Sequence, residues 1–172
     1  MEYCVQSGGE PGGPPRFLAD AMLGRLATWL RILGYDAEYS RAEDDVLLRR
    51  ARDEGRILLT RDIGLLRRRS EGVRNPADQP PPHLLVHSDH AMEQVRQVVR
   101  SLGLNPGAPL ARRCARCNAV LKPRAKPEVA GRVPEFVWSH HDTFWGCSTC
   151  DRIYWAGSHR LRIDETIRAL MA

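Results

Sequence analysis

Short apolar runs that end in aspartate and lead into helical patterns restrict the fold of this chain more than any other feature. The first run extends from Arg16 to Asp20 and the second from Arg56 to Asp62. Between them, the acidic cluster Glu43-Asp44-Asp45 opens another helical pattern. Strand and helix alternate four times between Arg16 and Gly103, which predicts an α/β fold with a parallel sheet and right-handed crossovers.

The acidic residues are expected to meet in space, because the carboxyl ends of parallel strands lie at one edge of the sheet. Clustered carboxylates repel one another unless a cation compensates them, and oxygen ligands suit Mg²⁺ or Mn²⁺. We therefore predict that Asp20, Asp44 and Asp62 form a divalent-metal centre for phosphate chemistry. Asp45 is the alternative to Asp44. Asp89 is either a fourth ligand or, in the reading we favour, a helix N-cap.

The composition changes along the chain in a way that predicts three segments. Residues 1–15 are rich in Gly and Pro at their end and are expected to be a disordered tail. Residues 16–104 form the α/β domain. A linker with two prolines and a glycine follows, and residues 111–172 form a small second domain. In that second domain we predict strands at Pro134–Trp138 and Ile153–Ala156 and a terminal helix over Leu161–Met171.

Four cysteines in two matched pairs dominate the second domain. Cys114 and Cys117 form one C-x2-C turn, and Cys147 and Cys150 form the other, about thirty residues later. Each turn directs two thiolates at one ion, and two such turns complete a tetrahedral structural zinc site. An iron–sulfur cluster or a redox dithiol explains two matched pairs less well. The segment is too short to bury a large core, so the zinc is expected to supply much of its folding free energy.

The charge of the chain favours an anionic partner. Its formal net charge is +5, and its basic residues are nearly all arginine, which binds phosphate bidentately. We assign Arg25, Arg31 and Arg61 to substrate binding, although solvation is an equally good reading for the first two. The aromatic residues of the second domain suit either stacking on bases or, in the reading we favour, a small core. They are Trp138, Trp145, Tyr154 and Trp155.

Two absences in the sequence bear on location. There is no apolar run long enough for a transmembrane helix, and the first residues lack the pattern of a signal peptide. We therefore expect a cytoplasmic protein without membrane association, in which paired cysteines bind metal. The sequence leaves open a homo-oligomer or a ribosome- or RNA-associated partner.

Three sequence blocks, in this order, resemble the Mut-seven C-terminal RNase domain family. The first is Phe17–Ala27 with Trp29–Asp36, and the second is Arg56–Asp62. The third combines both cysteine pairs with Asn118 and the segment Tyr154-Trp155-x-Gly157-Ser158-His159. The resemblance covers nearly the whole chain after Pro15 and is more specific than any single motif.

The resemblance implies a PIN-like nuclease fold followed by a zinc ribbon, with an acidic RNase centre that depends on Mg²⁺ or Mn²⁺. Asp20 and Asp62 match the family pattern directly, and Asp44 is the middle acid that spacing favours. The function predicted on this basis is cleavage of RNA phosphodiester bonds. The alternative is an RNA-binding or adaptor protein with a zinc ribbon and a weak or vestigial nuclease centre.

Overall fold

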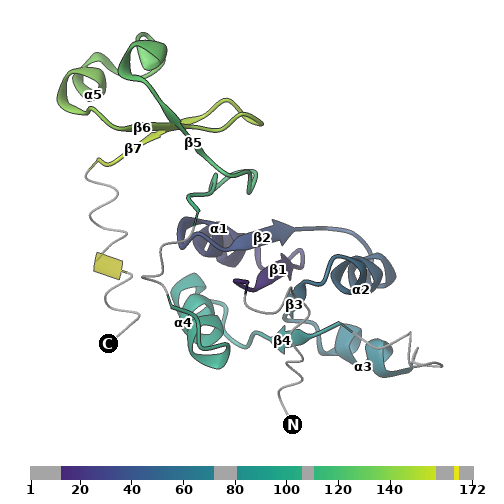
Figure 1. The fold of residues 1–172 in the computed structure, drawn as a ribbon. Helices are drawn as coiled ribbons and strands as arrows, with labels where there is room; N and C mark the ends of the chain where they lie inside the picture. Colours follow the sequence, from purple (N-terminus) through teal and green to yellow (C-terminus); the bar gives the residue numbers. More distant parts are fainter. Residues whose placement is uncertain (1–12, 72–80, 106–110, 158–164, 167–172) are drawn as a thin grey trace.

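A computed structural model describes residues 13–71, 81–105, 111–157 and 165–166. Two sheets organise the described chain, a parallel one in the first part and an antiparallel one in the second (Figure 1). The predicted N-terminal tail and terminal helix lie almost wholly outside the described residues, as does nearly all of the predicted linker.

The first sheet has four strands, all parallel, as the sequence predicts. Its order is β2-β1-β3-β4, so β2 and β4 are its edge strands. The strands that lead to Asp20 and Asp62 are therefore central neighbours, which places both aspartates at the same edge. The strands are β1 (Arg16–Ala19), β2 (Asp36–Tyr39), β3 (Ile57–Thr60) and β4 (His83–Leu85).

Helices cover both faces of this sheet (Figure 1). The helices α1 (Gly24–Ile32) and α4 (Ala91–Ser101) pack together on one face, around buried side chains such as Phe17, Leu59 and Val95. On the other face, α2 (Asp44–Asp53) and α3 (Ile63–Glu71) cover a smaller core that contains Leu18 and Leu58. The residues of β1 and β3 point alternately to these two cores, as the period of two of a strand requires.

Glycine ends two of these helices where the sequence pattern predicts it. Gly34 and Gly55 have φ values of 96° and 60°, and each donates its backbone N–H to a carbonyl of the last helical turn. Residues with a Cβ rarely adopt this left-handed conformation, so glycine is the usual residue directly after a helix. These turns direct the chain back toward the start of the next strand.

The second segment contains a small antiparallel sheet of three strands in the order β5-β6-β7. They are β5 (Lys122–Arg124), β6 (Phe144–Gly146) and β7 (Ile153–Trp155). Between β5 and β6 lie a short 3-10 helix (Lys126–Val129) and α5 (Glu135–His140). The strand predicted near Ile153 is thus confirmed, whereas the one predicted over Pro134–Trp138 is wrong.

The segment after Pro134 forms the helix α5 for two reasons that the structure shows. Pro134 precedes the first helical residue, a position where proline is tolerated because its missing N–H has no partner to lose. Phe136 and His140, four residues apart, stack with ring centroids 4.1 Å from each other. Residues four positions apart are neighbours on the surface of a helix, so this contact stabilises α5. The aromatic and β-branched residues of this segment suggested a strand, but they lie in a helix.

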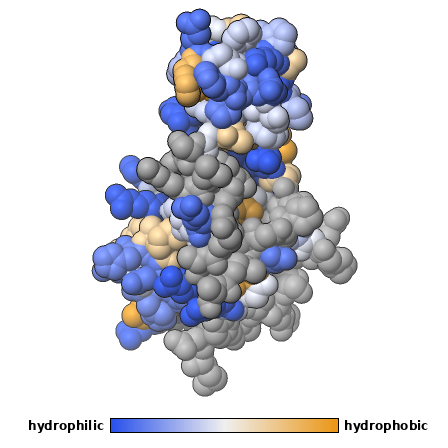
Figure 2. Space-filling view, turned by 90° about the vertical axis from the view of Figure 1, so that its left-hand side faces the viewer, coloured by the Kyte–Doolittle hydropathy of each residue, from blue (hydrophilic) through white to orange (hydrophobic). Residues whose placement is uncertain are grey.

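Figure 2 shows the second segment as a narrower upper lobe with many hydrophilic side chains on the face in view. Its small core is built around Cys114, Leu121 and Cys147 and is separate from the two cores of the parallel sheet. None of the helices in the described ranges is long and apolar enough to span a membrane.

Candidate nuclease site and zinc centre

Asp20 follows β1 at the carboxyl edge of the parallel sheet, and its side chain is buried, with 5% exposed. Three donors fix its carboxylate. Its Oδ1 accepts from the backbone N–H of Met22 at 2.9 Å, and its Oδ2 accepts from the Thr60 hydroxyl at 2.5 Å and the Arg61 N–H at 3.2 Å. Hydrogen bonds to the ionised form offset the cost of burying a carboxylate. These three bonds hold the Asp20 carboxylate in one orientation at the edge of the sheet.

Asp62 follows β3 at the same edge, and Thr60 connects it to Asp20. The Thr60 hydroxyl that donates to Asp20 also accepts from the backbone N–H of Asp62 at 2.9 Å. The Oδ1 atom of Asp62 accepts from the N–H groups of Gly64 at 2.7 Å and Leu65 at 3.2 Å. Asp62 is thus also the N-cap of α3, and this exposed side chain retains a second oxygen for another ligand.

The middle acids begin α2, with Glu43 at its N-cap position and Asp44 and Asp45 in the first turn. The helix therefore starts one residue earlier than an N-cap at Asp44 would place it. In the described part of the chain, the only group of three or more potential ligand side chains gathered around one point is the cysteine cluster. The three aspartates are accordingly not assembled into a closed coordination sphere.

Asp89 is not the N-cap of α4, because His90 occupies that position. Its carboxylate instead forms an ion pair with the Arg61 guanidinium. Arg61, assigned to substrate binding, is therefore already paired with an acid close to the edge that carries Asp20. Asp89 therefore lies at this edge as the ion-pair partner of Arg61, and the prediction that it is a helix N-cap is wrong.

The two arginines predicted on the first helix occupy different environments. Arg25 is exposed, whereas Arg31 is buried, with 7% of it accessible. Arg31 donates from Nε to the Ala37 carbonyl at 2.7 Å and from one terminal nitrogen to the carbonyls of Ala115 at 3.2 Å and Arg116 at 2.8 Å. Burial lowers the pKa of Arg31, and the nearby Glu38 carboxylate is the largest opposing influence. Its main contacts thus hold the first cysteine turn against α1 and β2.

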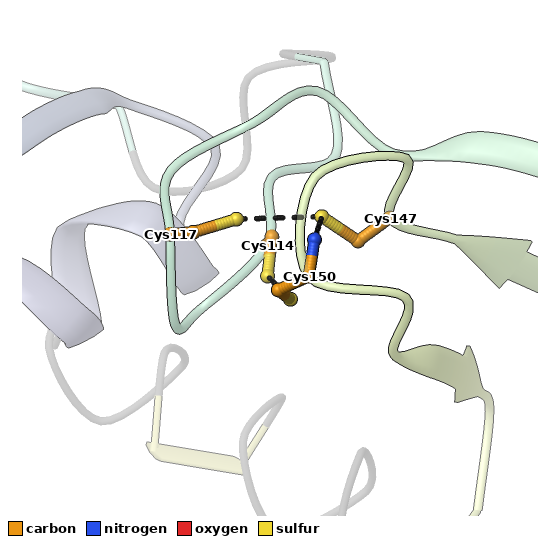
Figure 3. A group of neighbouring side chains, drawn as sticks. All are labelled: Cys114, Cys117, Cys147 and Cys150. Carbon is orange, nitrogen blue, oxygen red and sulfur yellow. Dashed lines mark hydrogen bonds between the residues drawn. The ribbon is translucent and has the colours of Figure 1, made fainter.

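The four cysteines converge as the sequence predicts (Figure 3). Their sulfur atoms all lie within 4.8 Å of one another, with Cys117 3.3 Å from Cys147 and Cys114 3.4 Å from Cys150. A zinc–sulfur bond of about 2.3 Å in a tetrahedron separates the sulfurs by about 3.8 Å. All four thiols are free. The donor set and its spacing therefore fit one tetrahedral zinc ion.

Neighbouring groups prepare one of these thiols for ligation. Burial favours the neutral thiol of Cys114, but hydrogen bonds from the Tyr154 hydroxyl and from backbone N–H groups of the turn outweigh it and lower its pKa to about 6. The Tyr154 hydroxyl lies 3.0 Å from the Cys114 sulfur. In contrast, burial raises the pKa of Cys117 to about 12. A bound cation would favour the thiolate form of every cysteine.

The residue after the first cysteine turn joins the two segments. Asn118 is buried with φ of 70°, and its Oδ1 accepts from the Ala37 N–H of edge strand β2 at 3.1 Å. Its Nδ2 donates to Asp36 at 2.8 Å and Glu38 at 3.0 Å. Burial alone would raise the pKa of Asp36, but hydrogen bonds from Arg56 and Asn118 lower it. The cysteine turn is therefore anchored to the sheet by a polar interface.

The aromatic residues divide between core and surface. Trp145 and Tyr154 pack partly buried against the cysteine cluster, as the core reading predicts, and the Arg112 guanidinium lies over the Trp145 ring at 4.1 Å. Trp138 stands outside this core with 38% exposure, although its indole N–H donates to the Lys126 carbonyl at 3.1 Å.

Four residues of this region have no role in the sequence-based prediction, namely Thr60, Arg41, Arg116 and Asn118. Thr60 had a visible signal, because a hydroxyl two residues before a strand-end aspartate can bond the backbone of that aspartate. Asn118 had one as well, since asparagine tolerates the left-handed conformation that its position requires. Arg41 and Arg116 had no local signal among so many arginines.

A family model described as the Mut7-C RNAse domain matches residues 15–167 of this chain. The match covers most of the sequence, so the protein belongs to that family. No significant match is found among curated proteins or among solved structures.

Proposed function

We propose that this protein is a metal-dependent ribonuclease that cleaves RNA phosphodiester bonds at the carboxyl edge of its parallel sheet. Membership of an RNase domain family supports a nuclease-like function. The observation that carries the finer proposal is the Asp20–Thr60–Asp62 connection, in which the Thr60 hydroxyl donates to the Asp20 carboxylate and accepts from the backbone N–H of Asp62 at the end of the neighbouring strand. Such a pair of acids at the ligand-binding edge of an α/β sheet suits phosphate chemistry.

The residues present fit Mg²⁺ or Mn²⁺. These ions are held by one or two carboxylates together with waters and substrate phosphates, so a closed protein cage is not required. A divalent ion bound there supplies an activated water and neutralises charge on the phosphodiester. Asp62 would present its uncommitted oxygen, and Asp20 would contribute a carboxylate held in place by three donors. Asp44, or Asp45, would contribute from the start of α2, on the other side of the edge.

The experiment is cleavage of a labelled single-stranded RNA in Mn²⁺ by wild type and by Asp20→Asn. We expect the variant to lose activity by orders of magnitude, because it replaces a ligand carboxylate with a neutral amide. Asp53→Asn is the matched control, since this exposed aspartate lies at the far end of α2 and, among the residues that the structure describes, pairs only with Arg52. Equal cleavage by Asp20→Asn and wild type would refute the assignment.

An adaptor with a vestigial centre is the second candidate, and one observation favours it: the three aspartates are not gathered around one point. The same assay separates the two candidates. RNA binding without any cleavage in Mg²⁺ or Mn²⁺ would support the adaptor.

A further inference from the structure

A cleft of about 620 Å³ opens beside Asp20, and residues from both segments line it. Ala21 and Met22, directly after Asp20, border it on the nuclease side together with the first turns of α1 and α4. Ala115 and Arg116 of the first cysteine turn border it on the other side. The cleft therefore extends from the residues next to Asp20 to the first cysteine turn.

The lining of this cleft is strongly cationic. It includes four arginines, of which Arg25, Arg41 and Arg116 are exposed and Arg31 is buried. Among the described residues, none of the three exposed arginines has a carboxylate partner. The one acid in the lining, Asp89, is already paired with Arg61. Unpaired charges of one sign in a concave surface focus the potential and attract a polyanion.

The positions of these arginines are partly fixed before any ligand binds. Arg41 donates from Nε to the Tyr39 hydroxyl at 2.9 Å, and its guanidinium lies 5.8 Å from the Tyr39 ring centre, so its terminal nitrogens remain available. Arg116 stands in the cysteine turn, and its own carbonyl accepts from Arg31 at 2.8 Å. A guanidinium held by a side-chain contact, like that of Arg41, loses less entropy when it binds phosphate oxygens, and for Arg116 the backbone position is what is fixed.

We propose that this cleft holds a single RNA strand, which runs from the acidic edge onto the first zinc knuckle with phosphates on Arg25, Arg41 and Arg116. The choice of RNA rests on the proposed nuclease function. Arginine forks match phosphate oxygens, and a divalent ion shared with substrate phosphates would offset the neighbouring carboxylates. A single strand can enter a concave cleft, whereas a duplex presents its phosphates on a convex surface.

One consequence concerns the zinc ribbon, which becomes part of the substrate-binding surface. Arg116 lies between the two cysteines of the first turn, so the zinc that holds that turn also positions this arginine. The ribbon should then contribute to RNA affinity while the chemistry stays with the aspartates of the sheet.

The test measures fluorescence anisotropy of a labelled single-stranded RNA with the full-length, zinc-loaded chain, without added Mg²⁺ or Mn²⁺. The variant Arg41→Ala/Arg116→Ala should weaken binding roughly threefold to tenfold for each arginine removed. Its plot of log affinity against log salt should flatten by about 0.7 for each lost contact, as expected for single strands. The control is Arg100→Ala, because this exposed arginine lies at the other end of α4 and has no ion-pair partner in the described chain.

Equal affinity and salt dependence for the double variant and wild type would overturn the proposal, even if wild type cleaves RNA. Equal competition by a duplex, or stronger binding of an acidic peptide, would overturn it as well. Zinc content and thermal melts of each variant show whether a loss reflects misfolding, and charge reversal at Arg116 alone provides a second, independent variant. Binding that depends on the two arginines in a wild type unable to cleave RNA would support the cleft and refute the nuclease function.

Discussion

Asp62 caps a helix in the structure and is also a proposed metal ligand, and two substitutions separate the observed role from the proposed one. Its Oδ1 atom accepts from the N–H groups of Gly64 and Leu65, which makes it the N-cap of α3. The carboxylate as a whole is a proposed metal ligand. Asp62→Asn keeps an oxygen for the cap but removes the charge, whereas Asp62→Ala removes both.

The expected stability changes follow from the cap. Loss of an Asp N-cap to alanine costs about 1 kcal/mol, and asparagine caps about as well as aspartate. In a domain of this size, about 1 kcal/mol lowers the melting temperature by roughly 4–8 °C. Without metal, Asp62→Ala should therefore melt several degrees below wild type, and Asp62→Asn should melt close to it.

The rates of RNA cleavage should not follow the order of the melting temperatures. Both variants lose the charged ligand, so both should cleave single-stranded RNA in Mn²⁺ slower than wild type by orders of magnitude. Excess Mn²⁺ should raise the melting temperature of wild type, because an ion that binds only the folded state stabilises it, and should raise that of the variants less. RNA binding should persist in both, since arginines carry it.

The assay combines circular dichroism melts, with and without Mn²⁺, and cleavage of a labelled RNA by the same preparations. Asp62→Asn with wild-type cleavage would refute the metal-ligand role. Asp62→Asn with the same loss of stability as Asp62→Ala would refute the capping argument, because the amide oxygen should replace Oδ1.

Two further predictions concern the second segment and its interface. The purified chain should contain about one zinc ion by elemental analysis, as four thiolates form a closed tetrahedral site, and Cys147→Ser should lose it. That variant should retain the helical signal of the first domain, whose cores are separate, and a fully cooperative loss of both domains would contradict this. Asp36 predicts a pH dependence, because its pKa is lowered in the fold despite burial, by hydrogen bonds from Arg56 and Asn118. A lowered pKa means that the carboxylate stabilises the protein fully above its ordinary pKa of about 4 and loses this contribution as pH falls through the lowered value. The difference in urea midpoint between wild type and Asp36→Asn should thus be constant from pH 7 to about pH 5 and shrink below about pH 4. A difference that stays the same at pH 3 would show that the Asp36 charge does not matter.

Much of the first domain could be predicted from the sequence because its signals are local. Apolar or alternating runs of strand length, helical periodicity and the glycines after α1 and α2 indicate β1 to β4 and the helices between them. The placement of Asp20 and Asp62 at one edge then follows from the parallel sheet alone. The cysteine cluster was predictable for a similar reason, since each C-x2-C turn is local and one ion requires both turns.

The errors arose where a local pattern has two solutions. The residues after Pro134 combine aromatic and β-branched side chains, which favour a strand, with a proline that also suits the start of a helix. Asp89 precedes a helix and has the side chain of an N-cap, yet the helix begins after His90 and the carboxylate pairs with Arg61. A competing ion pair 28 positions away in the sequence leaves no trace in the local pattern.

The contacts between the two segments could not be predicted from local sequence patterns, because they join residues that are far apart in the sequence. Asn118 bonds Ala37 across 81 positions, and Arg31 bonds the carbonyls of the cysteine turn across 84 and 85. Asn118 satisfies an N–H of edge strand β2 that would otherwise be open to pairing with another chain.

These same contacts decide which arginines can meet a substrate. With Arg31 bonded to the carbonyls of the first cysteine turn, Arg25, Arg41 and Arg116 are the exposed arginines of the cleft lining that have no carboxylate partner in the described part of the chain. The carbonyl that Arg31 holds belongs to Arg116 itself, so the buried arginine positions an exposed one. The first cysteine turn and edge strand β2 are thus joined by hydrogen bonds through Arg31 and Asn118. A change in the first cysteine turn should therefore affect Arg116 and the proposed RNA-binding cleft before it affects the aspartates that we propose as metal ligands.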